Sequence, residues 1–314
     1  MNKKKYRLIT RSDMDGLVCA VLLKHLDMID DVKFVHPKDM QDGIIEVTEN
    51  DITTNLPYVD GVAIAFDHHL SETVRNKEIK KNHIILPDAP SAAEVVYQYY
   101  GGESKFPKIF IPMMEAANKA DAAKFSRENI LNPKGWDLLS FLMDSRTGLG
   151  RFRDFRISNY ALMMNLIDAC KDRTINEIME LRDVKERVDL YYKYEEDFIF
   201  QLKKCSIIYD NVVVLDLRDE EIIYPGNRFM LYTLFPETNI SIHQIWGFKK
   251  QNTVFAVGKS IINKSSKANI GDLMLNYNGG GHMAAGTCQV PHDTAQAVLD
   301  DIIESLKDKE TCSA

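Results

Sequence analysis

Residues 62–66, VAIAF, form an uninterrupted apolar run that ends directly at Asp67-His68-His69. A strand without a polar position is typical of a parallel sheet that is covered on both faces. Three polar side chains at the end of a buried strand each require a partner, because an unpaired buried polar group costs free energy. The pattern predicts a buried parallel strand whose carboxyl end carries a polar site.

Other short segments repeat this strand pattern and alternate with helical ones. Strands are predicted at residues 7–10, 32–35 and 44–47, and helices at 17–26, 92–100, 110–123, 136–143 and 157–171. Ser91 with Glu94 three residues later forms a capping box, and Gly101-Gly102 ends that helix. Alternating strands and helices predict an α/β fold with a doubly wound parallel sheet in the N-terminal half.

The C-terminal third has a different organisation. A long charged helix is predicted at 174–204, followed by a hairpin around Asp210-Asn211, strands at 239–248 and 253–259, and a final helix near 294–307. We therefore predict a catalytic domain at 1–175, a helical linker at 176–204 and a smaller α/β domain at 205–314, with a cleft between the two domains.

Composition limits the classes of function. The chain has 314 residues and a formal net charge of -7, which argues against binding of long duplex nucleic acid. The cysteines lack CxxC spacing and predict reduced thiols in the cytoplasm: Cys19, Cys170, Cys205, Cys288 and Cys312. No apolar stretch reaches the length of a membrane span. The oligomeric state stays open, with a homodimer among the alternatives.

A second polar group follows the first predicted strand. Asp13 and Asp15 come directly after residues 7–10, as Asp67-His68-His69 follows 62–66. Ligands of open α/β sheets bind at the carboxyl ends of strands, so both groups are expected to face one crevice. Carboxylates and imidazoles suit Mn²⁺, Mg²⁺, Fe²⁺ or Zn²⁺, and two such ions can clamp a phosphoryl group.

These motifs, in this order, resemble the DHH family of phosphoesterases. Residues 9–16, ITRSDMDG, resemble the family's first motif, and Phe66-Asp67-His68-His69 resembles the third. Residues 90–94, PSAAE, look like the helix start that follows, and residues 279–286, GGGHMAAG, match the signature of the DHH-associated type 1 domain. The resemblance spans nearly the whole chain and includes nanoRNases, phosphoadenosine phosphate phosphatases and, more distantly, exopolyphosphatases.

The resemblance implies roles for individual residues. The metal ligands would be Asp13, Asp15, Asp51, His68 and Asp121. Asp60 competes with Asp51 for the second motif, and Asp144 competes with Asp121 for the fourth. Asp67 would orient a ligand, and His69 would contact the substrate phosphate. Mn²⁺ is the first candidate, ahead of Mg²⁺, Co²⁺, Fe²⁺ and Zn²⁺, with one or two ions bound.

One position departs from the family pattern. The family has histidine two residues before the first aspartate, where this chain has Arg11, and arginine cannot ligate a metal. Three interpretations follow, in this order. Arg11 contacts the substrate phosphate in place of a metal; the first metal binds weakly or with an added water; or the chain only binds nucleotide and has lost catalysis.

The glycine-rich segment is predicted to bind substrate. Three consecutive glycines allow the backbone to approach a ligand, and by resemblance Gly279, Gly280, Gly281 and His282 hold the nucleotide. Lys259 is a candidate for the terminal phosphate, and Arg228 is a weaker one. Arg146, in a basic glycine-containing run, is a candidate for lining the cleft.

Together these features predict a metal-dependent phosphoesterase that hydrolyses phosphodiester or phosphomonoester bonds of small nucleotides. Short oligoribonucleotides, phosphoadenosine phosphate and cyclic dinucleotides with their linear products are the substrates considered. An exopolyphosphatase or pyrophosphatase is the alternative enzyme, and a nucleotide-binding regulator with degenerate catalysis is the alternative of another class.

Overall fold

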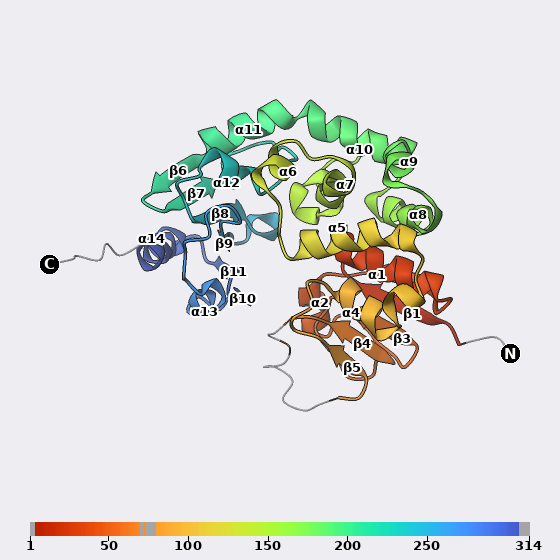
Figure 1. Ribbon diagram of the computed structural model, residues 1–314. Coiled ribbons are helices and arrows are strands. Elements are labelled where there is room, and N and C mark those ends of the chain that lie inside the picture. Colours follow the sequence, from red (N-terminus) through yellow and green to blue (C-terminus); the bar gives the residue numbers. More distant parts are fainter. Residues whose placement is uncertain (1–3, 70–71, 73–79, 308–314) are drawn as a thin grey trace. The chain divides into compact units, whose positions relative to one another are not determined.

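The computed structural model describes residues 4–69, 72 and 80–307 (Figure 1). The chain divides into two compact units, Met1–Phe125 with Asn132–Tyr191 and Ser126–Leu131 with Tyr192–Ala314. Four cysteines are free thiols, whereas Cys312 lies outside the described residues. Within the described part of the chain, no helix combines the length and apolar character needed to cross a bilayer.

The first unit is built on a five-stranded, all-parallel sheet. Its order is β2-β1-β3-β4-β5, which is the arrangement of a doubly wound α/β fold and confirms the predicted class. The strands are β1 (Tyr6–Thr10), β2 (Ile29–Phe34), β3 (Asp51–Thr54), β4 (Ile64–Asp67) and β5 (His83–Ile85). Thr10 pairs with Thr54, and Thr54 pairs with Phe66, so β1, β3 and β4 end at one edge of the sheet.

Helices bury the two faces of this sheet. The larger core joins β1, β3 and β4 to α1 (Met14–His25), α4 (Ala92–Tyr99), α5 (Ile111–Asp121), α7 (Gly135–Met143) and α8 (Asn159–Asp172). Figure 1 shows α1, α4 and α5 together over the sheet, consistent with their mutual contacts. On the opposite face, Met40 of α2 (Pro37–Gln41) packs against Ile9 and Leu56.

The third strand begins later than the sequence pattern predicts. Residues 44–47 do not form a strand; Ile44 is exposed, and Ile45 and Val47 pack against the cluster around Ile9 from a loop. The strand at this place is β3, Asp-Ile-Thr-Thr, which contains one aliphatic residue. A hydropathy pattern misses this strand because its side chains are polar and are buried by hydrogen bonding to polar partners. For example, the hydroxyl of Thr54 donates to the hydroxyl of Thr10 at 2.7 Å.

The predicted helix at 174–204 is also wrong as a single element. The structure has three helices there, α9 (Ile175–Met179), α10 (Arg182–Lys193) and α11 (Glu195–Lys204). Thr174 and Glu177 form a capping box that starts α9. The helices are interrupted at Glu180-Leu181 and at Tyr194. Neither position has a glycine or proline, so the sequence pattern gives no sign of the interruptions.

The second unit contains a mixed six-stranded sheet of order β10-β11-β9-β8-β7-β6. Its strands are β6 (Ser206–Tyr209), β7 (Val212–Asp216), β8 (Ile240–Trp246), β9 (Thr253–Lys259), β10 (Gly280–His282) and β11 (Ala285–Val290). The predicted hairpin joins β6 to β7, and Asp210 at its turn has a φ of 54°. One face packs on α13 (Ile270–Leu275) and α14 (Ala295–Leu306), and the unit also holds α6 (Arg127–Leu131) and α12 (Met230–Leu234).

The three glycines lie in and beside β10 rather than in a free loop. A Cβ atom on Gly279 would lie 2.2 Å from the Thr287 carbonyl oxygen, and one on Gly281 would lie 2.3 Å from that of Ala285. Both glycines are therefore required for the packing of β10 on β11. A Cβ atom on Gly280 would meet nothing within 4 Å, so only this glycine faces open space.

Candidate metal centre

The polar groups that follow β1 and β4 meet at the carboxyl edge of the first sheet. Asp15, His68 and Asp121 place one ligand atom each within 4.8 Å of one another. Asp15 is in the first turn of α1, His68 follows β4, and Asp121 is the last residue of α5. The structure thus brings together three of the five predicted metal ligands. Asp13 caps the same helix by accepting a hydrogen bond from the Gly16 N–H at 3.0 Å.

His68 is held with one nitrogen directed to the cluster. Its Nδ1 lies 3.1 Å from the Ala89 carbonyl oxygen, which only accepts hydrogen bonds, so Nδ1 carries a proton. Its Nε2 lies 2.9 Å from Oδ2 of Asp121. Burial would lower the pKa of His68, but the hydrogen bond and charge of Asp121 raise it to about 9. When Nε2 loses its proton, its lone pair is oriented for a metal.

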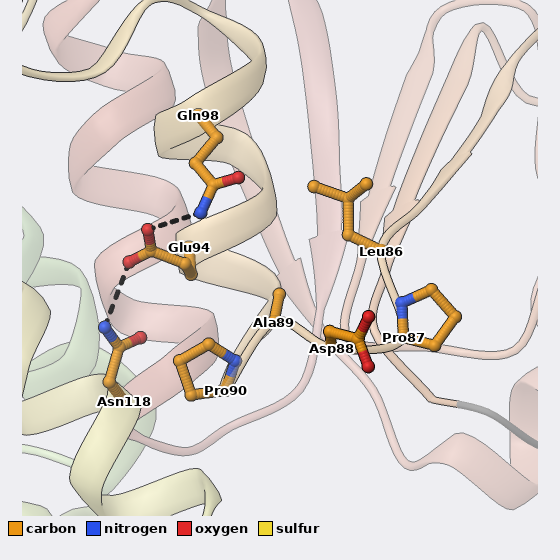
Figure 2. A pocket seen from close by; sticks show the side chains of 8 residues that line it. All are labelled: Leu86, Pro87, Asp88, Ala89, Pro90, Glu94, Gln98 and Asn118. Atoms are coloured by element: carbon orange, nitrogen blue, oxygen red, sulfur yellow. Dashed lines mark hydrogen bonds between the residues drawn. The ribbon is translucent and has the colours of Figure 1, made fainter.

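The loop that supports His68 borders a cavity of about 430 Å³ (Figure 2). On its far side, the Glu94 carboxylate accepts hydrogen bonds from Gln98 at 2.8 Å and from Asn118 at 3.0 Å. Ser91, which caps α4, donates to the Asn118 amide oxygen at 2.6 Å. These bonds tie the start of α4 to α5. They therefore fix the two helices next to the candidate metal ligands Asp15, His68 and Asp121, which are called the metal cluster below.

Asp15 is a buried acid whose pKa is strongly affected by its surroundings. Its oxygens accept hydrogen bonds from the backbone N–H groups of Ala92 at 3.0 Å and Ala93 at 2.7 Å, at the start of α4. Burial, followed by the negative charges of Asp121 and Asp13, raises the pKa of Asp15 to about 7. Burial also raises the pKa of Asp13. Gathered carboxylates of this kind are stabilised by a cation among them, so the donor set fits a divalent metal.

Asp67 forms hydrogen bonds that fix the position of His69. Its Oδ1 accepts from the backbone N–H groups of His68 and His69 and lies 2.7 Å from Nδ1 of His69. Burial would lower the pKa of His69, but this hydrogen bond and the charge of Asp67 raise it. The other oxygen, Oδ2, is buried without a hydrogen-bond partner among the described residues. Asp67 therefore orients His69, and its Oδ2 is available to a bound group.

The structure does not bring Asp51 to this cluster. Asp51 begins β3, opposite Arg7, whereas the cluster lies where the parallel strands end. Its carboxylate is 2.7 Å and 2.9 Å from two nitrogens of Arg7 and accepts from the Thr48 N–H. The prediction that Asp51 bridges two metals is therefore corrected, because its oxygens are used in an ion pair at the other edge. Asp60, the competitor, is an exposed partner of Lys80.

Sequence reasoning missed Asn55, which occupies the corresponding place at the correct edge. It follows β3 directly, and its N–H donates to the carbonyl oxygen of Phe66, the residue before Asp67. Asn55 is 1% exposed and has a φ of 54°. Both atoms of its side-chain amide are buried without a hydrogen-bond partner among the described residues. A buried polar residue with a positive φ directly after a strand is the signal that would have identified it.

Two arginines border the cluster. Nε of Arg11 lies 3.0 Å from Oδ2 of Asp13, and Nε of Arg146 lies 2.7 Å from Oδ1 of Asp144. Partial burial would lower the pKa of Arg146, but Asp144, and after it Asp13 and Asp121, raise it. Asp144 is therefore a partner of Arg146, while Asp121 is the acid that joins His68.

The predicted substrate-binding residues of the second unit lie at its β10 edge. Gly280 and His282 belong to β10, and Lys259 ends β9, whose Gly258 pairs with Ala285 of β11. Nζ of Lys259 donates to the Ala268 carbonyl oxygen at 2.9 Å, which anchors this lysine to the loop before α13. Arg228 stacks on the ring of Phe229, with 3.9 Å between the guanidinium carbon and the ring centroid.

The chain matches no family model and no curated protein sequence. Among solved structures, it is similar to the pGpG-specific phosphodiesterase PggH from Vibrio cholerae, with 57% identity, a TM-score of 0.81, and coverage of 96% of this chain and 99% of that one. Manganese-bound RecJ from Thermus thermophilus shares 14% identity and a TM-score of 0.53 over 96% of this chain and 52% of that one. CDC45 from Entamoeba histolytica shares 8% identity and a TM-score of 0.50 over 96% and 95%.

The fold and the metal cluster define a hydrolase that acts on phosphate esters. With a relative 57% identical over nearly its whole length, the chain belongs to the DHH family of metal-dependent phosphoesterases, as the motifs predict. The more distant structures share the fold alone.

Proposed function

We propose that this protein hydrolyses pGpG, a linear guanine dinucleotide with a 5′-phosphate, to two molecules of GMP. The observation that carries the proposal is the 57% identity to a pGpG-specific phosphodiesterase over 96% of this chain. The reaction adds water across the internal phosphodiester, breaking the bond between phosphorus and the 3′-oxygen of the first nucleoside. Both products then carry a 5′-phosphate.

Asp15, His68 and Asp121 would hold the metal, with Mn²⁺ the first candidate and Mg²⁺ the second. When bound, such an ion supplies a hydroxide at neutral pH and neutralises phosphate charge. His69, oriented by Asp67 at 2.7 Å, would donate a hydrogen bond to the substrate phosphate. The raised pKa of His69 supports this role because it favours the protonated form of the imidazole, which donates hydrogen bonds.

We infer that a single metal resides in the centre. By the family pattern, a second ion would take ligands at the positions of Arg11 and Asn55, and neither residue supplies a carboxylate or an imidazole. Arg11 already pairs with Asp13 at 3.0 Å, so its positive charge takes the place of a cation beside that carboxylate. Its guanidinium is also suited to paired hydrogen bonds with phosphate oxygens.

In the second unit, Gly280, His282 and Lys259 would contact the substrate. Gly280 supports this because it alone of the three glycines faces open space. Gly279 and Gly281 would act indirectly, by allowing β10 to pack on β11. In the first unit, Arg146 would contact a phosphate from beside Asp13 and Asp121.

The test is turnover of pGpG by purified protein with Mn²⁺, followed by chromatography of GMP. Asp15→Asn should reduce turnover by more than about 100-fold, since the amide cannot replace a charged ligand. Phosphoadenosine phosphate, a cyclic dinucleotide and pyrophosphate complete the panel. Binding of pGpG without release of GMP would favour a nucleotide-binding regulator, and preferred hydrolysis of pyrophosphate would refute the proposal.

A further inference from the structure

A cavity of about 460 Å³ opens beside Asp13, entirely within the first unit. Four segments line it: the loop after β1, the end of β2 with the start of α2, Ile45, and residues 144–146. A drug-sized ligand usually occupies roughly 300–1,000 Å³. The cavity therefore has room for one nucleoside of a dinucleotide whose internal phosphate lies at the metal cluster.

Two of the charges that line this cavity are unpaired. Lys33 on β2 and Asp39 in α2 are both half-buried, and neither makes an ion pair or side-chain hydrogen bond with another described residue. The other charged groups of the lining are paired, Arg11 with Asp13 and Arg146 with Asp144. Partly buried opposite charges normally find a partner, because each loses hydration. Both charges are therefore open to a ligand that occupies the cavity.

Ring surfaces accompany the two charges. Phe34 lines the cavity and makes an edge-to-face contact with Tyr160, with ring centroids 5.7 Å apart. His36 accepts a hydrogen bond from the Lys38 N–H through Nδ1 at 3.1 Å, so its neutral ring carries the proton on Nε2. A flat apolar ring beside hydrogen-bonding groups is the environment in which proteins hold a single extruded base.

Guanine is the base whose edges match these groups. It has acceptors at O6 and N7, which a lysine ammonium can contact, and donors at N1 and N2, which a carboxylate can accept. Adenine has an amino group in place of O6 and no donor at N1 or C2. Adenine keeps the N7 acceptor, so Lys33 would lose only its contact with O6, but Asp39 would lose both donors of the N1 and N2 edge, and such a mismatch is strongly rejected.

We propose that the cavity beside Asp13 binds one guanine base of the substrate and that Lys33 and Asp39 determine the preference for guanine over adenine. This inference rests on the proposed hydrolysis of pGpG and extends it by naming the base-recognising residues. Neither residue belongs to the metal cluster, so their replacement should alter base preference while leaving the metal in place.

The experiment compares kcat/KM for pGpG and pApA in wild-type protein and in the variants Lys33→Met and Asp39→Asn. Each variant should lower kcat/KM for pGpG by about 10-fold to 100-fold, as expected for loss of a base-edge contact, and leave pApA unchanged. Lys38→Met and Asp42→Asn are matched controls, because this pair lies 2.5 Å apart in the same segment and does not line the cavity. The controls should keep the wild-type ratio.

Calorimetric titration of the same proteins with GMP and with AMP gives a second readout that needs no turnover. Wild-type protein should prefer GMP, and Lys33→Met should lose that preference. An equal loss for guanine and adenine ligands would overturn the inference, since it would indicate contact with phosphate. Absence of pGpG hydrolysis by wild-type protein would count against the proposed function, whereas a GMP preference lost on substitution would still support the base site.

Discussion

Nε2 of His68 and Oδ2 of Asp121 lie 2.9 Å apart, although one residue follows a strand and the other ends a helix much later in the chain. With Asp15, they form a centre whose members come from three separate segments. An unfolded chain cannot assemble such a centre, so a metal that binds there stabilises the folded state by mass action.

Addition of Mn²⁺ to metal-free protein should therefore raise its melting temperature, and a chelator should reverse the change. At a free concentration 100 times the dissociation constant, the stabilisation is about 2.7 kcal/mol. Asp121→Asn and His68→Ala should remove most of this shift in a thermal melt. Asp144→Asn is the matched control and should retain it. A full shift in Asp121→Asn would contradict the assignment of this acid.

The stability of metal-free protein should depend on pH because the pKa of Asp15 is raised. Its pKa of about 7 is above the ordinary 3.8, so the stabilising contribution of the protonated acid is complete below pH 4 and is lost as pH rises through 7. The Asp15→Asn variant should consequently lose stability less steeply between pH 5 and 8, as measured by urea unfolding in chelator. Mn²⁺ affinity should rise over the same interval, because the ion displaces the proton.

The number of bound Mn²⁺ ions should increase when Arg11 and Asn55 are replaced by metal ligands. Wild-type protein should retain one Mn²⁺ per chain by elemental analysis after gel filtration. The double variant Arg11→His, Asn55→Asp should retain two, since it adds an imidazole and a carboxylate at the carboxyl edge of the sheet. Two ions in the wild-type protein would refute the inference of a single metal.

Arg7 and Asp51 should serve stability rather than catalysis. Arg7→Met should lower the free energy of unfolding at pH 7 by about 1–3 kcal/mol, because it leaves the buried carboxylate without its cation. Burial raises the pKa of Asp51, but the hydrogen bonds and charge of Arg7, together with the hydrogen bonds of Thr48, lower it by more. The stabilising contribution of the ionised acid is therefore present above about pH 4 and disappears as pH falls further. Turnover of the folded variant should match wild type.

The exposed ion pair of Lys185 with Glu180 provides the control for that experiment, with 2.6 Å between its atoms. Lys185→Met should change stability by less than about 0.5 kcal/mol. A loss of Mn²⁺-dependent turnover in folded Arg7→Met would show that Asp51 acts in the site after all.

Substitutions at two neighbouring glycines should separate folding from binding. Gly281→Ala places a Cβ atom 2.3 Å from a backbone oxygen and should destabilise the second unit by about 1–3 kcal/mol in thermal unfolding. Gly280→Ala meets no atom within 4 Å and should leave the melting temperature unchanged while raising KM for pGpG. The reverse pattern would refute the proposed contact at Gly280.

Sequence patterns recovered the parts of the fold in which hydrophobicity follows the structural period. Sequence patterns predict β4, α1, α5, α7 and the strands β6 to β9 of the second sheet within a few residues, whereas they predict a loop at β10 and give no strand at β11. The polar strand β3 is not predicted, because its stability comes from matched hydroxyls and an ion pair, which hydropathy does not register. The division into domains at 176 and 205 and the cleft between them stay predictions.

The same contrast applies to the site. The motifs lead to Asp15, His68 and Asp121, and the structure brings these three together, while their role as metal ligands stays a prediction. Asp51 was misplaced because residue type and order along the chain do not reveal at which end of a strand an acid lies. Asn55 was overlooked because an amide is not expected where a family has an acid, and its burial is visible only in three dimensions.

The position of Asn55, directly after β3 and beside the end of β4, also has a consequence for comparing relatives of this protein. If the proposed single-ion centre is correct, one residue after β1 and one after β3 would separate a centre with one ion from a centre with two. Related sequences can therefore be sorted by these two positions alone, Arg11 and Asn55 in this chain. Substitutions at these two positions would change how much metal a cell needs for this protein, while the fold of the protein would stay the same.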